Sequence, residues 1–215
     1  FSGNTGYIAY SASEGMMSFD NVSVTGNNAQ IYSVNNVELK ISNSEFIDND
    51  NSGSLIYVVN KDRETKITKS LFKENKKLIL DFDANSSLIV DSCSFIGNTD
   101  KLLDIIGGSN TTIGHSIFEK NILPVVNQEN EKRENLVSSY GNVDIKSSSF
   151  FDNKCGNMVY ITSLDAENNT FVKNDVSSII YQVYSGEIFR LSNNTIISNR
   201  ASDYPLYANS SAKAY

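Results

Sequence analysis

The chain has 215 residues, of which 40% are hydrophobic, so it is long enough for one domain and apolar enough to bury a core. Its formal net charge is −7 and it carries no basic stripe, which argues against nucleic acid and anionic membrane surfaces as partners. No apolar run approaches the ~18–20 residues needed to span a bilayer and no signal peptide is present, so no direct membrane insertion is expected in this segment.

The first four residues introduce a motif that recurs along the whole chain. Phe-x-x-Asn, or a variant with Val or Ile in place of Phe, returns with a period of about 24 residues, too short for most paired-helix repeats and suited to one turn of a β-solenoid. The composition agrees, because 28 Asn and 31 Ser favour turns while abundant Ile, Val, Phe and Tyr favour strands. The nine copies begin at Phe1, Val24, Phe46, Phe72, Phe95, Phe118, Phe150, Phe171 and Ile196.

A strand is expected after each copy of the motif, with one aliphatic residue per turn facing the core. These residues are Ala9, Ile31, Ile56, Ile79, Leu103, Val126, Val159, Ile180 and Leu206. Side chains alternate along a strand, so the residue after each of them should face outward. That outward column consists of Tyr10, Tyr32, Tyr57, Leu80, Asp104, Asn127, Tyr160, Tyr181 and Tyr207.

A second strand and a corner are expected before each following copy of the motif. The residues seven and five positions before the Phe position are mostly apolar, and their spacing of two predicts a strand with both facing inward. The residues three positions before it are small or polar and predict a corner. They are Asn21, Asn43, Lys69, Ser92, His115, Ser147, Asn168 and Asn193.

The Asn that closes each motif is interpreted as structural. Asn tolerates turn geometry, and amides stacked at about 4.8 Å would hydrogen bond to each other as a ladder. Nine equivalent positions cannot all form one active site. The expected ladder consists of Asn4, Asn27, Asn49, Asn75, Asn98, Asn121, Asn153, Asn174 and Asn199.

These columns predict an all-β fold, a right-handed single-stranded parallel β-helix of about nine rungs of ~24 residues, with three short strands per rung. Residues 1–215 should form a single β-helix segment, and both ends cut through a rung. We therefore expect a piece of a longer repeat protein that could self-associate through open solenoid ends. The polar insert at 128–135 lengthens one rung and is expected to loop outward, as a functional or a merely tolerated loop.

The repeat resembles those of chlamydial polymorphic membrane proteins and of β-helical adhesin-like surface proteins of archaea and other microbes. The resemblance implies a right-handed β-helix of the pectin lyase-like type, an extracellular or cell-surface location and a role in adhesion. The chlamydial Gly-Gly-Ala-aliphatic partner motif is replaced by looser forms such as GSLIY at Gly53–Tyr57. The barrel expected in that family is also absent from the sequence, so only the fold and the location carry over readily.

Catalytic and metal-binding residues are not expected. Asp81, Asp83 and Asp104 come nearest to a glycosidase carboxylate pair, but no second acidic column reinforces them. The short polygalacturonase-like string Asn98-Thr99-Asp100 begins on a ladder position. His115, the only histidine, falls at a corner and lacks partners for a metal site or a nucleophile triad. We expect no cofactor and no metal.

The two cysteines, Cys93 and Cys155, fall on different corners and are expected to be free thiols. Six Asn-x-Ser/Thr sequons permit N-glycosylation but occur at about the number expected by chance. They begin at Asn21, Asn85, Asn110, Asn168, Asn193 and Asn209.

The sequence therefore predicts a non-catalytic, adhesin-like structural or binding β-helix, extracellular or at the cell surface, with glycans or surface proteins as partners. The alternatives are a polysaccharide lyase or glycoside hydrolase of the β-helix class, and an architectural subunit of an extracellular filament. Exposed tyrosines suit contact with sugars or proteins, although a tyrosine column can also be a stacking ladder that protects the sheet. The candidate ligand-binding residues are Tyr10, Tyr32, Tyr57, Tyr160, Tyr181, Tyr207 and Asp104.

Overall fold

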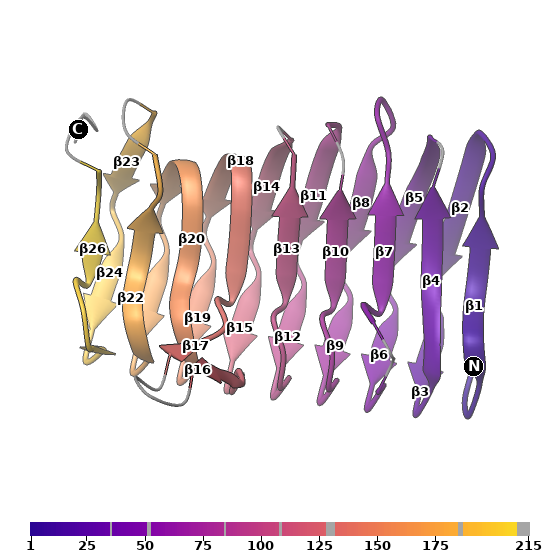
Figure 1. The fold of residues 1–215 in the computed structure, drawn as a ribbon, viewed down its shortest axis with the longest axis horizontal. Helices are drawn as coiled ribbons and strands as arrows, with labels where there is room; N and C mark the ends of the chain where they lie inside the picture. Colours follow the sequence, from indigo (N-terminus) through magenta and orange to yellow (C-terminus); the bar gives the residue numbers. More distant parts are fainter. Residues whose placement is uncertain are drawn as a thin grey trace.

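The protein is an all-β parallel solenoid of about eight turns (Figure 1). The structure is a computed structural model that describes residues 1–34, 36–50, 53–83, 85–107, 109–127, 132–184 and 187–209. Strands of successive turns lie side by side along the long axis, and the N-terminal and C-terminal strands lie at opposite ends of it. These residues contain no helix, and hence none long and apolar enough to cross a membrane.

The larger sheet has 16 strands and two arms, which are joined through the long strands β18 and β20. All of its pairings are parallel. The first arm holds β1 (Thr5–Ser11), β4 (Asn28–Val34), β7 (Ile56–Val59), β10 (Leu80–Asp83), β13 (Leu103–Ile106), β18 (Val137–Lys146), β20 (Lys154–Glu167), β22 (Asp175–Gln182), β25 (Arg200–Ala201) and β26 (Leu206–Tyr207). The second arm holds β2 (Gly15–Asp20), β5 (Val37–Ser42), β8 (Thr65–Thr68), β11 (Ser87–Asp91), β14 (Asn110–Gly114), the later parts of β18 and β20, and β23 (Phe189–Ser192).

A separate sheet of eight parallel strands carries the Phe position of the motif. It is formed by β3 (Ser23–Thr25), β6 (Glu45–Ile47), β9 (Leu71–Lys73), β12 (Ser94–Ile96), β15 (Ile117–Glu119), β19 (Ser149–Phe151), β21 (Thr170–Val172) and β24 (Thr195–Ile197). The expected count of nine is too high by one. The first copy of the motif contributes only an isolated bridge between Ser2 and Thr25 and forms no strand.

Two columns of residues with positive φ turn the chain just before and just after each strand of this sheet. The eight predicted corner residues all adopt the left-handed conformation, with φ between 47° and 58°. The second such column is the residue before each ladder Asn, for example Asp48 and Lys173, and not the Asn itself. Left-handed geometry is unfavourable for residues other than Gly and Asn, so the surrounding ladder must hold it in place.

The core is one continuous cluster in which equivalent side chains of successive turns stack. Six phenylalanines of the motif, Phe46, Phe72, Phe95, Phe118, Phe150 and Phe171, are fully buried. Their ring centroids are 4.6–5.0 Å apart and their planes differ by 3–11°. That spacing equals the distance between neighbouring strands, so the backbone hydrogen bonds between strands determine the spacing of the rings.

The aliphatic column of the first arm differs from the prediction at two turns. The register pairs Ile56 with Leu80, not Ile79, and Leu103 with Val137, not Val126. Ile79 and Leu80 are consecutive and both buried, so alternation could not choose between them. Val126 is exposed on an antiparallel hairpin formed by β16 (Val125–Asn127) and β17 (Lys132–Arg133), so it lies outside the aliphatic column. Residues 128–131 of the insert lie outside the described residues.

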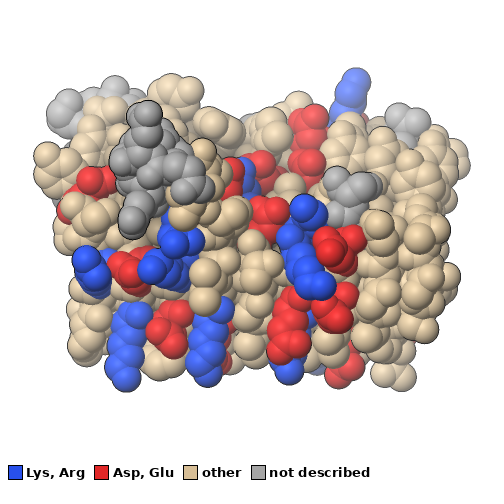
Figure 2. Space-filling model, turned by 60° about the horizontal axis from the view of Figure 1, so that its bottom comes forward, with Lys and Arg blue, Asp and Glu red and all other residues tan. Residues whose placement is uncertain are grey.

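Charged side chains lie around this core on the outer surface. In the face seen in Figure 2, Lys and Arg are interspersed with Asp and Glu. Ion pairs connect neighbouring turns, such as Lys76 with Asp48 at 3.3 Å and Arg190 with Asp165 at 2.9 Å. Exposed pairs of this kind contribute little stability, so the core and the ladders stabilise the fold.

Candidate functional site: the tyrosine face

The closing asparagines lie inside the molecule, where no ligand can reach most of them. Each Asn from Asn4 to Asn174 donates from Nδ2 to Oδ1 of the next Asn at 2.8–3.2 Å. From Asn27 onward, each Nδ2 also donates to the carbonyl oxygen at the Phe position of the preceding turn. Asn27 to Asn174 are buried, whereas Asn4 is exposed.

The outward column of the first arm brings all seven candidate ligand-binding residues onto one face. The register places Asp81 between Tyr57 and Asp104, and Ser138 between Asp104 and Tyr160. The predicted members Leu80 and Asn127 do not belong to this column. Leu80 belongs to the inward aliphatic column, and Asn127 lies on the hairpin of β16 and β17. The tyrosines therefore form two stacks separated by three polar residues.

The rings within each stack are nearly parallel. Tyr32 lies 5.3 Å from Tyr10 and 5.0 Å from Tyr57, measured between ring centroids. In the other stack, Tyr181 lies 5.6 Å from Tyr160 and 4.5 Å from Tyr207. Both stacks thus fit the interpretation as a ladder that covers the sheet. Because the rings pack face to face, they turn their edges outward and do not offer a flat ring face.

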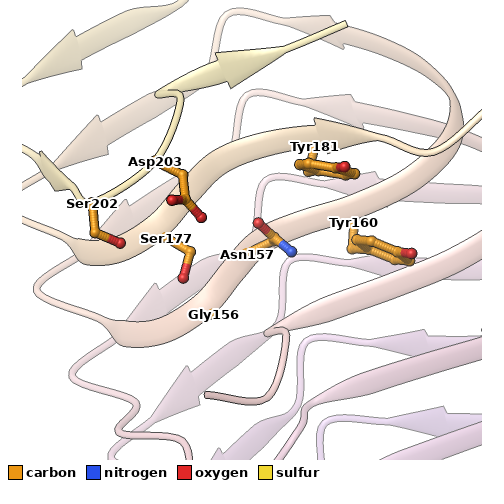
Figure 3. A pocket seen from close by; sticks show the side chains of 7 residues that line it. All are labelled: Gly156, Asn157, Tyr160, Ser177, Tyr181, Ser202 and Asp203. Carbon is orange, nitrogen blue, oxygen red and sulfur yellow. The ribbon is translucent and has the colours of Figure 1, made fainter. Parts of the chain in front are cut away.

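A groove of about 440 Å³ lies beside the second stack (Figure 3). It is lined by Gly156, Asn157, Tyr160, Ser177, Tyr181, Ser202 and Asp203. Figure 3 shows the Tyr160 and Tyr181 rings side by side at one end, with the Asn157, Ser177 and Asp203 side chains at the other. Burial raises the pKa of Tyr160, so its hydroxyl stays protonated and can donate a hydrogen bond at neutral pH.

Backbone contacts between turns fix the wall of this groove. The Ser202 N–H donates to the Val176 carbonyl at 2.9 Å, and the Asp203 N–H donates to the Ser177 carbonyl at 3.0 Å. The segment after β25 is therefore held against β22, which orients the Asp203 carboxylate toward the groove. No pattern in the sequence marks this wall, because the wall depends on the connection after the two-residue strand β25.

A second cavity of about 370 Å³ shares Asn157 and Tyr160 with the groove and extends to Lys101 and Asp104. Lys101 Nζ lies 3.0 Å from Asp104 and 3.6 Å from Glu134. Burial alone would lower the pKa of Lys101, but its hydrogen bond to Asp104 and the charges of Asp104 and Glu134 outweigh burial and raise the pKa. Lys101 is therefore a firmly charged ammonium in the middle of the face.

The Asp81 carboxyl lies on the same face, beside Asp104. Burial raises its pKa above the ordinary aspartate value, and the neighbouring carboxylates of Asp104 and Asp83 raise it further. Lys101 opposes this effect. Asp81 and Asp104 are register partners on neighbouring strands, so their side chains leave the sheet about 5 Å apart.

The insert is docked against the body of the solenoid at this face. The Gly156 N–H donates to the Glu134 carbonyl at 2.7 Å, and Arg133 Nη1 donates to the Leu123 carbonyl at 2.6 Å. Asn135 accepts hydrogen bonds from the Asn157 N–H and side-chain amide. A Cβ at Gly156 would overlap the Arg133 carbonyl oxygen, so only Gly permits this approach.

The remaining singled-out residues lie away from the tyrosine face. His115 is an exposed corner residue whose Nδ1 lies 2.8 Å from Asp91 Oδ1. Cys93 and Cys155 are free and buried, and burial raises the pKa of Cys93 to about 12, which makes it unreactive as a nucleophile at neutral pH. The described residues hold no cluster of three or more His, Cys, Asp and Glu suited to a metal.

The sequon asparagines differ in accessibility. Asn21, Asn168 and Asn193 are exposed at left-handed corners, and Asn85 and Asn110 are exposed elsewhere. Asn209 is half-buried, and its Nδ2 donates to the Val183 carbonyl at 3.2 Å. N-glycosylation at these positions stays a prediction.

No protein-family model and no curated protein matches the chain. Among solved structures, the chain is similar to HetL, a pentapeptide repeat protein involved in heterocyst differentiation regulation from the cyanobacterium Nostoc sp. strain PCC 7120. The identity is 10%, the alignment covers 91% of this chain and 87% of HetL, and the TM-score is 0.26. The assignment as a parallel solenoid therefore stands on the strand pairing itself.

Proposed function

We propose that this chain is a non-catalytic, extracellular or cell-surface solenoid of the adhesin type, whose tyrosine face binds glycans or surface proteins. We further infer a right-handed helix in which the two arms and the eight-stranded sheet form three faces of each turn. The single observation that carries the binding role is the outward tyrosine column ending in the groove. Tyrosine supplies a large apolar area with a polar tip, which suits both sugar rings and protein partners.

The two tyrosine stacks allow a matched test. A screen of glycans and surface proteins identifies a ligand, and its affinity is then measured for Y160A/Y181A and for Y32A/Y57A. Each variant loses two stacked, partly buried rings, so each should lose a similar amount of stability, about 0.5–1.5 kcal/mol per stacked pair in addition to the lost burial of ring area. Binding should weaken at least tenfold in Y160A/Y181A and stay unchanged in Y32A/Y57A. Equal affinities in both variants would refute the groove as the site.

A second candidate function is hydrolysis or lyase cleavage of a polysaccharide, which the Asp81–Asp104 pair favours. Retaining glycosidases place two carboxyl groups about 5 Å apart, one with a raised pKa as the acid and one ionised. Asp81 would be the acid and Asp104, paired with Lys101, the nucleophile. New reducing ends or unsaturated products released by the wild type, and lost in D81N and in D104N, would replace the binding proposal with this one.

A further inference from the structure

We infer that the groove continues into a cationic subsite and that the ligand of this face is an anionic glycan, a sugar chain bearing carboxylate or sulfate groups. This inference rests on the proposed function of the tyrosine face and deepens it. It starts from a third cavity of about 220 Å³, which shares Ser177 and Ser202 with the groove. The two cavities are therefore contiguous.

Three cations and one carboxylate line this third cavity: Arg133, Lys154, Arg200 and Asp175. Lys154, Asp175 and Arg200 are register partners on β20, β22 and β25, so their side chains leave the sheet in one row. Arg133 reaches the same cavity from the docked insert. In a chain with a net charge of −7, this local excess of positive charge runs against the overall charge.

Ion pairing with Asp175 does not explain the positions of Lys154 and Arg200. Lys154 Nζ lies 3.5 Å from Asp175, and Arg200 Nε lies 4.0 Å from it, both at the long end of ion-pair distances. The Arg200 side chain is 86% exposed, and such exposed pairs contribute little to folding. One carboxylate cannot neutralise three cations, so the cavity attracts a further anion.

The position of the cluster relative to the tyrosines selects a glycan as the occupant. A sugar ring that packs against the outward edges of Tyr160 and Tyr181 would meet hydrogen-bonding groups on Asn157, Ser177 and Asp203, and the next part of the chain would enter the cationic cavity. Carboxylate and sulfate groups both match the donors of Arg and Lys, and Arg can bind such groups with two parallel hydrogen bonds.

The test measures binding of the folded chain to three kinds of oligosaccharide of equal length: carboxylated oligogalacturonate, sulfated heparin fragments and a neutral glucan. The variants are K154Q/R200Q and, as a matched control, K40Q/K66Q, which removes two lysine charges from the second arm. Y160A/Y181A tests the tyrosines in parallel. Circular dichroism checks that each variant keeps the strand signal of the wild type.

We expect at least one anionic oligosaccharide to bind tenfold or more tightly than the neutral one, and the preferred anion distinguishes carboxylate from sulfate. K154Q/R200Q should reduce that affinity roughly ten- to hundredfold and leave neutral binding unchanged, because two charge-assisted contacts are lost. K40Q/K66Q should bind like the wild type, and rising salt should weaken only the anionic ligands.

Equal binding of neutral and anionic oligosaccharides, abolished by Y160A/Y181A and untouched by K154Q/R200Q, overturns the cationic subsite and leaves the tyrosine face standing. Absence of binding to any glycan overturns the glycan ligand altogether, and with it this inference. Preferential binding of a single-stranded oligonucleotide over all three oligosaccharides also overturns it.

Discussion

Replacing Asn98 by alanine tests how much the buried asparagine ladder contributes to stability. Asn98 Nδ2 donates to the Phe72 carbonyl at 2.9 Å and to Asn121 Oδ1 at 3.0 Å. Its Oδ1 accepts from the Asn75 N–H at 3.0 Å and from Asn75 Nδ2 at 3.1 Å. The substitution removes all four hydrogen bonds from a site with 0% exposure.

The expected cost follows from which groups lose a partner. The Asn75 N–H becomes a buried donor without this acceptor, at about 1–3 kcal/mol, and the other three bonds contribute about 0.5–1.5 kcal/mol each. We therefore expect Asn98→Ala to lower the free energy of unfolding by roughly 2.5–7.5 kcal/mol. Asn4→Ala is the matched control, because Asn4 makes the same Nδ2-to-Oδ1 bond from an exposed position, and we expect it to cost less than about 1 kcal/mol.

Urea denaturation followed by circular dichroism measures both variants, with the slope m checked for constancy. Hydrogen exchange should show faster amide exchange concentrated in the turns of Asn75, Asn98 and Asn121, because a solenoid turn contacts only its neighbours. The reasoning fails if Asn98→Ala and Asn4→Ala are equally stable, since the ladder would then be a consequence of the fold and not a cause of its stability.

Three further predictions follow from single sites. Asp81→Asn should raise the urea midpoint at pH 7. The folded-state pKa of Asp81 is raised, so above that pKa the ionised wild-type carboxyl lowers the free energy of unfolding. The gain from the substitution should vanish at about pH 3, where the wild-type carboxyl is protonated in both states. Gly156→Ala should cost about 1–3 kcal/mol and speed amide exchange in residues 132–136, because its Cβ displaces the Arg133 carbonyl, and an unchanged exchange pattern would show that the insert is not docked there. Cys93 and Cys155 should react with a thiol reagent only when urea unfolds the chain, and fast labelling of the native protein at pH 7 would contradict their burial.

Much of the fold could be predicted because most columns keep a fixed offset from the Phe position. The inward pairs such as Val90 and Phe95 and the corners such as Ser92 all lie before or within the motif, where no turn gains or loses a residue. The side-chain period of two then fixes which residues face the core. Asp48 and its equivalents were not recognised as left-handed, because charged residues there give no composition signal of the kind that Gly gives.

The first arm was harder because the connection after each ladder Asn varies in length. Leu80 follows Asn75 by five residues, whereas Val137 follows Asn121 by sixteen, so a column drawn at one offset fails at the insert. The row formed by Lys154, Asp175 and Arg200 could have been found from the sequence, because each of these residues directly follows a ladder Asn. Arg133 could not, because its place in the cavity depends on how the hairpin docks on Gly156.

A solenoid of equivalent turns repeats its surface chemistry, so a site unique to one place requires turns that depart from the repeat. The features that depart from the repeat all lie in one part of the first arm. The insert precedes β18, Gly156 admits the Arg133 carbonyl in the next turn, and the segment at Ser202 closes the groove two turns later. The three neighbouring cavities lie among these irregular turns, whereas the first tyrosine stack lies on turns without an insert. The same tyrosine column can therefore serve as a stabilising ladder at one end of the solenoid and as a binding surface at the other.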